Sequence, residues 1–438
     1  MVSVDATVVV AAFPALRAHF AETSAANLSW TINAYTIVFA SLLVPAGRAV
    51  DRFGHRRCFF IAMAGFTLAS AACAFAISSG TLILARVLKA VAAALLAPAS
   101  LALILAAFPE IYRARSAGLW SAAGALGASL GPVMGSLLID WFSWRLIFLI
   151  NVPVGLGVLW MGRGNHSEQR TVSSHHRFDV VGTSLLISGI GFLVGGLAQA
   201  GQGARSGWEV LQSPGIGLAL IAGYVVFARG KPNAPLGLFA NSNYRWASAA
   251  TLVLGMAFGL MFLAFYLFFT GVWKYPQSLA GVAGLPGPLA ATMVSVLVNK
   301  KQAEWGQKRL LTIGGILYAI SNLWLVMRIS PTPDYFGTWL PGQILGGMAI
   351  GLILPSIAGA AAECLKADNL GEGSAVNNAI RQIGSALGVA LAISLAGSTT
   401  AAIESFQQVY LCLMTAGLLI AVLALPLVSL RKPFGVRA

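Results

Sequence analysis

Residues 47–57 read Gly-Arg-Ala-Val-Asp-Arg-Phe-Gly-His-Arg-Arg and lie between two long apolar runs of the chain. The two glycines, Gly47 and Gly54, permit a tight turn and a close approach of helices. Asp51 lies among arginines, so it can cap a helix N-terminus and join a charge network that forms in one conformation and breaks in another. The alternative is a basic loop with an incidental acid. The candidate conformational switch comprises Gly47, Asp51, Arg52, Gly54, Arg56 and Arg57.

The composition of the chain excludes a soluble protein. Of the 438 residues, 58% are hydrophobic and only 10% are Asp, Glu, Lys or Arg, whereas a soluble domain has about 25% charged residues. The mean hydropathy is +0.80. The apolar runs are about 20 residues long, as membrane-spanning helices require, and a membrane β-barrel would instead show segments of roughly ten alternating residues. The chain is therefore predicted to be an all-α polytopic membrane protein.

Fourteen apolar runs are candidates for spans. They lie near residues 1–16, 29–46, 58–77, 81–107, 116–139, 144–162, 180–198, 212–228, 246–270, 279–298, 310–327, 337–360, 374–396 and 406–429. Six runs precede a hydrophilic connection at 163–177, two follow it, and six more complete the chain. We predict two six-helix bundles with an inserted two-helix hairpin. The predicted parts are an N-terminal bundle (1–165), a linker with the hairpin (166–230), and a C-terminal bundle with a short tail (231–438).

The distribution of basic residues predicts the orientation of these spans. The formal net charge is +14, which in a soluble protein would suggest nucleic-acid binding. Twenty of the 28 Lys and Arg residues, however, fall in connections on one side of the fourteen runs, and five fall on the other side. Because cytoplasmic loops are rich in Lys and Arg, we expect both termini in the cytoplasm and no nucleic-acid partner. The four widely spaced cysteines predict neither a metal site nor a disulfide framework.

Two short segments recur along the chain. Residues 299–309 read Asn-Lys-Lys-Gln-Ala-Glu-Trp-Gly-Gln-Lys-Arg and follow residues 47–57 by 252 positions. Gly384-Ser-Ala-Leu-Gly388 likewise follows Gly127-Ala-Ser-Leu-Gly131 by 257 positions. Internal repeats in a polytopic chain are typical of two-bundle transporters. The second basic stretch has Ala303 in the place of Asp51, so it cannot form the same charge network.

Four charged residues lie within the predicted spans: Asp5, Arg86, Lys89 and Arg381. A charge is unfavourable in hydrocarbon, so each is expected to face a cavity or a partner. Asp5 is the one acid among them and is the candidate proton-binding residue, although an acid favoured by the helix dipole at an N-terminus is an alternative. At 1.5 Å per residue, Lys89 lies nearer the depth of Asp5 than Arg86 does. This predicts an ion pair between Lys89 and Asp5, unless Lys89 snorkels or faces a watery cavity.

The fifth apolar run carries a pattern of small residues, Gly127-x-x-x-Gly131-Pro132-x-x-Gly135. Small residues four apart let two helix backbones approach closely, and a proline inside a helix kinks it. Ordinary small-residue packing, which any membrane bundle needs, is the alternative interpretation.

Together these motifs resemble those of the major facilitator superfamily. Residues 47–57 are similar to the signature between its helices 2 and 3, G-x-x-x-D-R-x-G-R-R, with His55 at a usually basic position. The pattern from Gly127 to Gly135 resembles the motif typical of its antiporters. Residues 4–14 (VDATVVVAAFP) and 144–153 (WRLIFLINVP) resemble the fourteen-helix drug:proton antiporter branch. Arg86 matches the helix 4 motif R-x-x-Q-G, whose Arg assists proton transfer in the family, but Lys89 and Ala90 replace its Gln and Gly.

The resemblance covers nearly the whole chain and implies a function. The branch exports drugs, dyes, antibiotics or envelope lipids in exchange for protons, by alternating access of two bundles. It implies a small amphipathic substrate, protons and the lipid bilayer as partners, and the cell membrane as location. We expect a monomer that is not an enzyme, uses no cofactor, and takes its energy from the proton gradient.

Polar and aromatic residues in the spans are candidates for the substrate path: Trp30, Asn33, Tyr35, Trp120, Asn151, Asn377, Asn378, Arg381 and Gln382. Aromatic residues at span ends also anchor helices at the membrane interface, and the polar stripe at 377–382 can instead hydrogen-bond between helices. Exporters of natural products or envelope lipids, a proton-coupled importer and a degenerate non-transporting paralogue stay open. The paralogue stays open because the first run is short and because Lys89 and Ala90 alter the helix 4 motif. The short first run predicts either a start codon assigned too late or a remnant.

Overall fold

The computed structural model describes the whole chain except residues 24, 163–179, 201–206, 229–234, 300–301, 366–369, 397–402 and 428–438. The first half contains α1 (Val2–His19), α2 (Ala25–Phe53), α3 (His55–Ala74), α4 (Ser79–Ala107), α5 (Glu110–Trp141), α6 (Leu146–Leu149) and α7 (Asn151–Met161). Then come α8 (Val180–Ala200) and α9 (Gly207–Ala228). The described part of the chain contains no β-strand, so the predicted all-α class is confirmed.

The second half begins with a 3₁₀ turn, η2 (Pro235–Ala240), and continues through seven α-helices and two π-helical turns. In order these are α10 (Ser242–Leu267), η3 (Phe268–Val272), α11 (Gln277–Ala283), α12 (Pro286–Asn299), α13 (Gln302–Arg328), η4 (Tyr335–Trp339), α14 (Leu340–Glu363), α15 (Leu370–Ala396) and α16 (Ile403–Ala424).

Many of these helices are long and apolar enough to cross a membrane. Among the described residues nine meet that requirement, and a tenth does so if the two parts of α5 form one bent span. Three further apolar helices are shorter: Leu146–Met161, Val181–Gly196 and Gln212–Ala228. The chain is therefore a polytopic membrane protein with about nine or ten candidate spans. This count, which covers the described residues, is lower than the fourteen spans predicted, so the number fourteen is not established.

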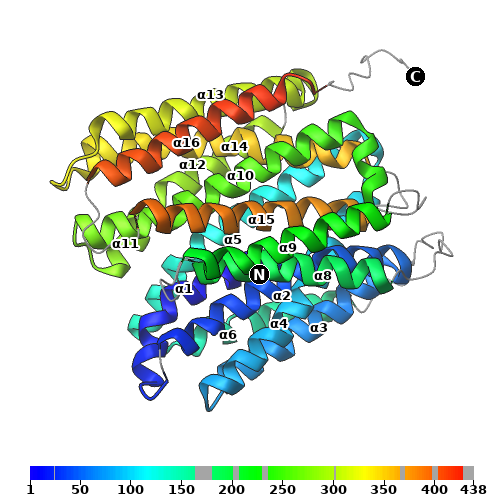
Figure 1. Cartoon of the computed structure of the whole chain (residues 1–438), viewed down its shortest axis with the longest axis horizontal. Coiled ribbons are helices and arrows are strands. Elements are labelled where there is room, and N and C mark those ends of the chain that lie inside the picture. Colours follow the sequence, from blue (N-terminus) through cyan, green and yellow to red (C-terminus); the bar gives the residue numbers. More distant parts are fainter. Residues whose placement is uncertain are drawn as a thin grey trace.

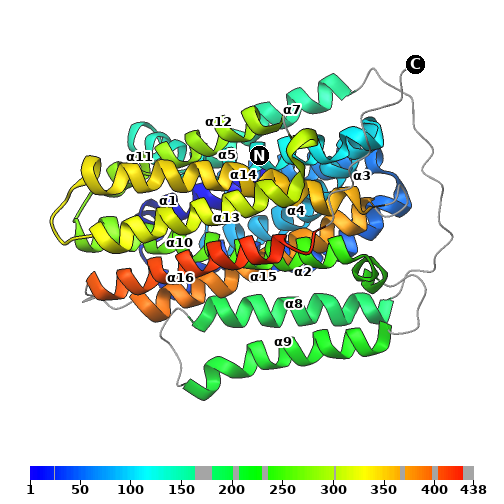
Figure 2. The same ribbon diagram turned by 90° about the horizontal axis from the view of Figure 1, so that it is seen from above.

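The helices run roughly along the long axis of the molecule (Figures 1 and 2). In Figure 1, α1–α4 and α6 lie in the lower part, and α10, α13, α14 and α16 lie in the upper part. The hairpin of α8 and α9 lies at one edge of the molecule in Figure 2, and α8 packs against both α2 and α15. The hairpin therefore contacts one helix from each half. We call the end of the molecule where α2 meets α3 the basic end.

Residues 47–57 do not form the loop that the sequence suggested. Helix α2 continues to Phe53 and α3 begins at His55, so that Gly54 alone separates them. Gly54 has a φ of 94°, a conformation that residues with a Cβ adopt only with strain. Gly306, at the matching place of the second basic stretch, has a φ of 72° and marks a kink inside α13. The two repeated glycines therefore make equivalent turns in the two halves.

The second repeat also occupies equivalent places. A Cβ atom on Gly131 of α5 would lie 2.9 Å from the carbonyl oxygen of Val4 in α1. A Cβ atom on Gly384 of α15 would lie 3.0 Å from the backbone nitrogen of Met256 in α10. In each half the repeated glycines thus let a later helix press against the first helix of that half. The internal repeat predicted from the sequence is visible in the packing.

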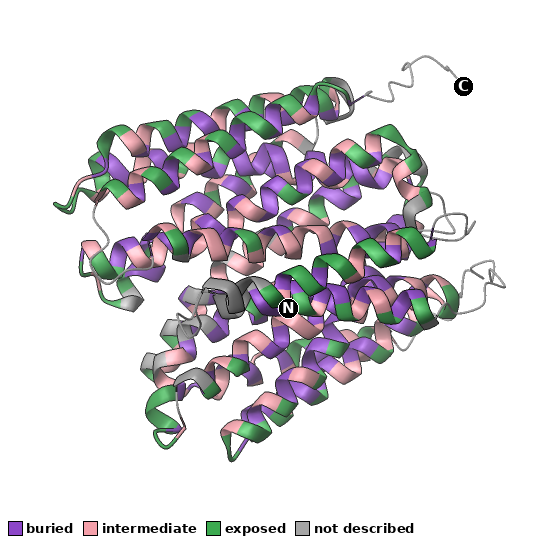
Figure 3. Ribbon diagram, viewed as in Figure 1, coloured by how far each residue is buried: buried purple, intermediate pink, exposed green. Residues whose placement is uncertain are grey.

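The burial pattern is that of a bundle surrounded by lipid. Buried positions form stripes along the helices, and exposed positions cover much of the outer helix faces (Figure 3). Large apolar side chains lie on the surface, among them Leu68, Ile77 and Met327. A soluble protein of this size would expose charged residues over such faces. The exposed apolar faces therefore agree with the membrane assignment.

Candidate functional site

The centre of the candidate site is Asp5, a fully buried carboxylate on α1. Arg86 of α4 donates a hydrogen bond from Nη1 to Asp5 Oδ2 at 2.7 Å. Lys89, one turn further along α4, donates from Nζ to Asp5 Oδ1. The ion pair predicted between Lys89 and Asp5 is therefore confirmed. The structure adds Arg86, which the depth argument had placed further from the carboxylate.

Aromatic rings and a backbone carbonyl complete the surroundings of the two cations. Arg86 donates from Nε to the carbonyl oxygen of Thr31 at 2.9 Å, and its guanidinium carbon lies 4.0 Å from the ring centre of Tyr35. The Lys89 Nζ atom lies 4.8 Å from the ring centre of Phe66 and 5.0 Å from that of Phe148. These faces stabilise a cation where water is excluded.

This cluster, Asp5 with Arg86 and Lys89, carries two positive charges and one negative charge at a site that is buried from solvent. Removing one partner of a buried ion pair typically destabilises a protein by about 3–5 kcal/mol, because a charge is left uncompensated. Protonation of Asp5 would have a related effect, since it removes the charge that both cations contact. The cluster therefore links the position of α1 to the charge on one carboxyl group.

A second group of contacts closes the basic end between the two halves. Asp51, near the end of α2, accepts hydrogen bonds from the backbone N–H groups of Gly371 and Glu372, each at 2.7 Å. Those groups belong to the first turn of α15, whose N–H groups have no partner within the helix. A carboxylate is favoured there by the helix dipole as well. Asp51 thus caps a helix of the opposite half, in agreement with the capping role that the sequence suggested.

Close backbone packing and an ion pair accompany this cap. A Cβ atom on Gly47 would collide with the Cβ atom of Ala375 and would lie 2.6 Å from the carbonyl oxygen of Gly371, so the close contact of α2 with α15 requires that residue 47 has no side chain. Arg48 donates from Nε to Glu372 Oε1 at 2.7 Å. It also donates from Nη2 to the hydroxyl oxygen of Tyr224 on α9, at 3.1 Å. Arg48 therefore joins the first half, the second half and the hairpin.

The arginines around Asp51 in the sequence do not surround it in space. The side-chain partner of Asp51 is His55, whose Nε2 lies 3.3 Å from Oδ1. Arg56 donates to the carbonyl oxygen of Gly162 at the end of α7, at 2.9 Å. Arg52 and Arg57 are exposed. The expected network of Asp51 with its neighbouring arginines is thus replaced by backbone N–H groups of α15 and by His55, and Arg48 pairs with Glu372 instead of Asp51.

The glycine motif of α5 supports the helix that carries Asp5. Gly127 and Gly131 pack against α1 at Val4 and Thr7. Helix α5 bends by 40° between Arg115–Ala128 and Val133–Ile139, in the region where the sequence predicted a kink. Gly135 is buried, and the side chain of Pro132 lies outside the described residues.

The candidate substrate-path residues of the first half lie in different surroundings. Tyr35 is buried, and its hydroxyl has no hydrogen-bond partner among the described atoms. Trp120 of α5 donates from Nε1 to the Ser100 hydroxyl of α4 at 3.1 Å. Asn151 is buried and donates to the carbonyl oxygen of Phe148. Trp30 is exposed and Asn33 is partly buried, so these positions do not form one cluster.

The polar stripe of the second half lies on α15. Asn377 donates from Nδ2 to the Thr251 hydroxyl of α10 at 3.1 Å, which is the interhelical bond considered from the sequence. Arg381 donates from Nη2 to Asn378 Oδ1 at 3.0 Å. Gln382 is partly buried. The stripe therefore includes one residue that joins helices and a cation bonded to a neutral amide.

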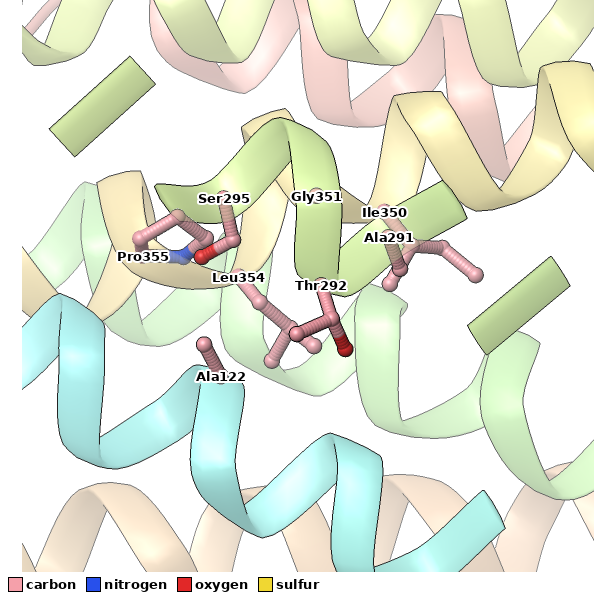
Figure 4. A pocket seen from close by; sticks show the side chains of 8 residues that line it. All are labelled: Ala122, Ala291, Thr292, Ser295, Ile350, Gly351, Leu354 and Pro355. Atoms are coloured by element: carbon pink, nitrogen blue, oxygen red, sulfur yellow. The ribbon is translucent and has the colours of Figure 1, made fainter. Parts of the chain in front are cut away.

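A small apolar pocket lies where α5 meets α12 and α14 (Figure 4). It is lined by Ala122, Ala291, Thr292, Ser295, Ile350, Gly351, Leu354 and Pro355. The Ser295 hydroxyl is buried, with no hydrogen-bond partner in the described structure. Because α5 comes from the first half and the other two helices from the second, the pocket marks a contact between halves.

Sequence reasoning missed several of these residues. Glu372 and Tyr224 complete the closed basic end, but neither lies in a recognisable motif. Glu372 lies just before the apolar run 374–396. An acid at the start of a predicted helix was the one feature of the sequence that could have indicated a role for this residue. Nothing in the local sequence indicates that α9 returns to Arg48.

The fold and the site together define a helical membrane protein built from two repeated halves. The chain belongs to the Major Facilitator Superfamily, whose family model matches residues 1–301 and 289–437. Its curated relatives include the puromycin resistance protein pur8 of Streptomyces alboniger, 35% identical over 415 residues that cover 92% of this chain and 80% of the relative. The multidrug resistance protein Stp of Mycobacterium tuberculosis is 32% identical, with coverages of 89% and 72%. The cephamycin export protein CmcT of Amycolatopsis lactamdurans is 30% identical, with coverages of 91% and 83%.

Solved structures agree on the fold. The human organic anion transporter MFSD10 superposes with a TM-score of 0.66 at 12% identity, over 95% of this chain and 96% of the other. The proton:xylose symporter XylE superposes with a TM-score of 0.65 at 14% identity, over 96% and 91%. At these identities the likeness establishes the architecture alone.

Proposed function

We propose that this protein is a proton-coupled exporter of drugs or other amphipathic small molecules and that it works by alternating access. Export is supported by the resistance and export proteins among its relatives, which it matches over most of their length. The buried cluster of Asp5 with Arg86 and Lys89 is the observation that carries proton coupling. The mechanism needs no enzymatic step, and the proton gradient supplies the energy.

The proposed topology is that of the fourteen-helix drug:proton antiporters. To the ten candidate spans are added α1, the pair α6–α7, α8 and α9, of which the last three contain shorter apolar stretches among the described residues. The excess of Lys and Arg in the connections at the basic end supports a cytoplasmic location of that end. In this topology the C-terminal end of α16 faces the cytoplasm, and the protein lies in the plasma membrane as a monomer.

In this proposal the described structure is closed towards the cytoplasm. Asp51 on the start of α15, the Arg48–Glu372 ion pair and the contact of Gly47 with Gly371 hold the halves together at the basic end. Opening this end to admit substrate requires all three contacts to break. Because they involve charged groups and close packing, they define a discrete closed state rather than a gradual one.

Protonation of Asp5 supplies the coupling step. A proton on Asp5 leaves Arg86 and Lys89 without a counter-ion in a dry place, which destabilises the arrangement of α1 against α4. Glycines of α5 press on the same turn of α1, so a shift of α1 is transmitted to α5. Helix α5 packs against α12 and α14 of the other half, which connects proton binding to the relative position of the halves.

The test is export in everted membrane vesicles that contain the protein, with and without an imposed proton gradient. We expect gradient-dependent accumulation of a dye or antibiotic, and we expect Asp5→Asn to reduce it to the level seen without the gradient. The matched control is Glu22→Gln, which neutralises an exposed acid. Undiminished gradient-driven export by Asp5→Asn would remove Asp5 from the mechanism.

A natural product or an envelope lipid is the second candidate substrate class. The relative named as a cephamycin export protein favours a natural product. Vesicles that accumulate a secreted antibiotic but no synthetic dye would support this narrower role. Absence of any accumulation, in a protein that is folded and inserted, would indicate a non-transporting paralogue.

A further inference from the structure

We infer that the substrate path favours organic anions and that Arg381 is the residue that binds their negative group. This inference rests on the proposed export function and specifies its substrate class. It depends on the place of Arg381, on the absence of a carboxylate partner for it in the described structure, and on the charge balance of the described spans.

Arg381 lies deep in the molecule, in a helix that contacts both halves. It is the twelfth residue of α15, so it lies about 16 Å along the axis from Leu370 and about 22 Å from Ala396. Helix α15 packs against α2 and α4 of the first half as well as against α10. A guanidinium this far from both ends cannot reach the membrane surface by snorkelling.

The guanidinium of Arg381 keeps hydrogen-bonding capacity for a ligand. Its hydrogen bond joins Nη2 to Asn378 Oδ1, a neutral amide oxygen. Among the described residues it forms no ion pair, whereas Arg48 and Arg86 both do. A guanidinium has five N–H donors in a planar fork that matches carboxylate, sulfonate and phosphate groups. Arg381 as a whole is partly exposed, so helix packing does not enclose the residue completely.

The remaining charges in the middle of the spans do not favour a cation. Asp5 is the acid there, and it already contacts both Arg86 and Lys89. With Arg381, the four residues carry three positive charges and one negative charge. Away from water, charges interact strongly, so a cationic substrate would meet repulsion and an anionic substrate would reduce the excess.

Carboxylates nearer the ends of the described helices are also engaged. Asp51 accepts from the first turn of α15, and Glu372 pairs with Arg48. Glu363 accepts a hydrogen bond from Gln307. These three carboxylates therefore already have partners in this state.

The experiment compares three dyes in proteoliposomes with an imposed proton gradient. The anion is 8-anilinonaphthalene-1-sulfonate, the neutral analogue is N-phenyl-1-naphthylamine, which has the same ring system without the sulfonate, and the cation is ethidium. We expect the wild type to export the anion in preference to ethidium. We expect Arg381→Gln to lower apparent affinity for the anion by at least about tenfold, as loss of a charge-assisted hydrogen bond predicts, while export of the neutral dye is retained. Arg381→Lys keeps the charge and should recover most of the anion affinity.

A measurement on the wild type alone covers the case in which Arg381→Gln does not fold. The anionic dye should inhibit export of the neutral dye at lower concentration than ethidium does. Equal or stronger inhibition by ethidium overturns the inference, as does an anion-to-neutral ratio that Arg381→Gln leaves unchanged. In both cases export itself stands. If the wild type exports none of the three dyes, the proposed function fails, and the inference fails with it.

Discussion

Lys89 is the residue whose identity distinguishes this site most clearly. It stands where the family motif has Gln, and it contributes the second positive charge on Asp5. A neutral side chain at this position would leave Asp5 with Arg86 alone. The two cations of α4 therefore determine how strongly the ionised form of Asp5 is favoured over the protonated form.

We predict that Lys89→Gln shifts the pH profile of export. With one of its two cations removed, the Asp5 carboxylate is less favoured relative to its protonated form. The half-maximal pH of gradient-driven export should rise by about one unit or more. Export is measured in everted vesicles over a range of pH, with Lys308→Gln, an exposed lysine of α13, as the control. An unchanged profile would mean that the pair has no part in coupling.

At the same scale, the sequence predicted contacts best where the physical demand was strongest. A charge in hydrocarbon needs a partner, so the pairing of Lys89 with Asp5 could be expected from the sequence, whereas the contact of Arg86 with Asp5 came from the structure. Asp51 was recognised as a helix cap, but the helix it caps lies 320 residues later, and no local pattern specifies that distance. Glu372 and Tyr224 were missed for the same reason, since their partner Arg48 is chosen by tertiary packing.

Among the elements, the pair formed by α1 and α5 is equivalent to the pair formed by α10 and α15, because both pairs contain the repeated glycines. Both pairs have backbones so close that a methyl group would collide with a neighbouring helix. The sequence predicted this repeat from spacing, and the helix partners came from the structure. The extent of the elements was less predictable: 144–162 and 279–298 each formed two helices, because Gly and Pro residues interrupt them.

We predict that Gly131→Ala and Gly388→Ala each destabilise the protein. The added methyl group would meet Val4 and Thr7 in the first case, and Met256 and Leu260 of α10 in the second. Overpacking of this kind destabilises by about 1–3 kcal/mol. The matched control is Gly223→Ala in α9, where nothing lies within 4 Å of the new Cβ, so its effect should stay within about 0.5 kcal/mol. Thermal unfolding of the detergent-solubilised protein measures all three, and equal stability of the variants would show that α1 and α10 can move aside.

For the whole molecule, the hairpin α8–α9 is the part whose role the sequence described least. It was recognised as an insertion between two six-helix bundles, and the division at 1–165, 166–230 and 231–438 stays a prediction. The structure shows α8 against both α2 and α15, and Tyr224 of α9 bonded to Arg48. The hairpin therefore has contacts that change when the halves separate at the basic end.

Alternating access requires that the closed basic end opens during each cycle, and this leads to a test on the whole molecule. We predict that a short bridge between Arg48→Cys and Glu372→Cys, formed with a cleavable bis-thiol reagent, abolishes export, and that cleavage restores it. The native Cys364 at the end of α14 reacts slowly, because burial raises the pKa of its thiol to about 11 and the thiolate is the reactive form. Replacing all four native cysteines with Ser removes the remaining ambiguity.

The control is each single cysteine variant treated with the same reagent, which should retain the export that it shows untreated. If bridged protein exports at the rate of the unbridged double variant, the contacts of Asp51, Arg48 and Glu372 hold a part of the protein that does not open. The transport path would then have to pass elsewhere between the halves.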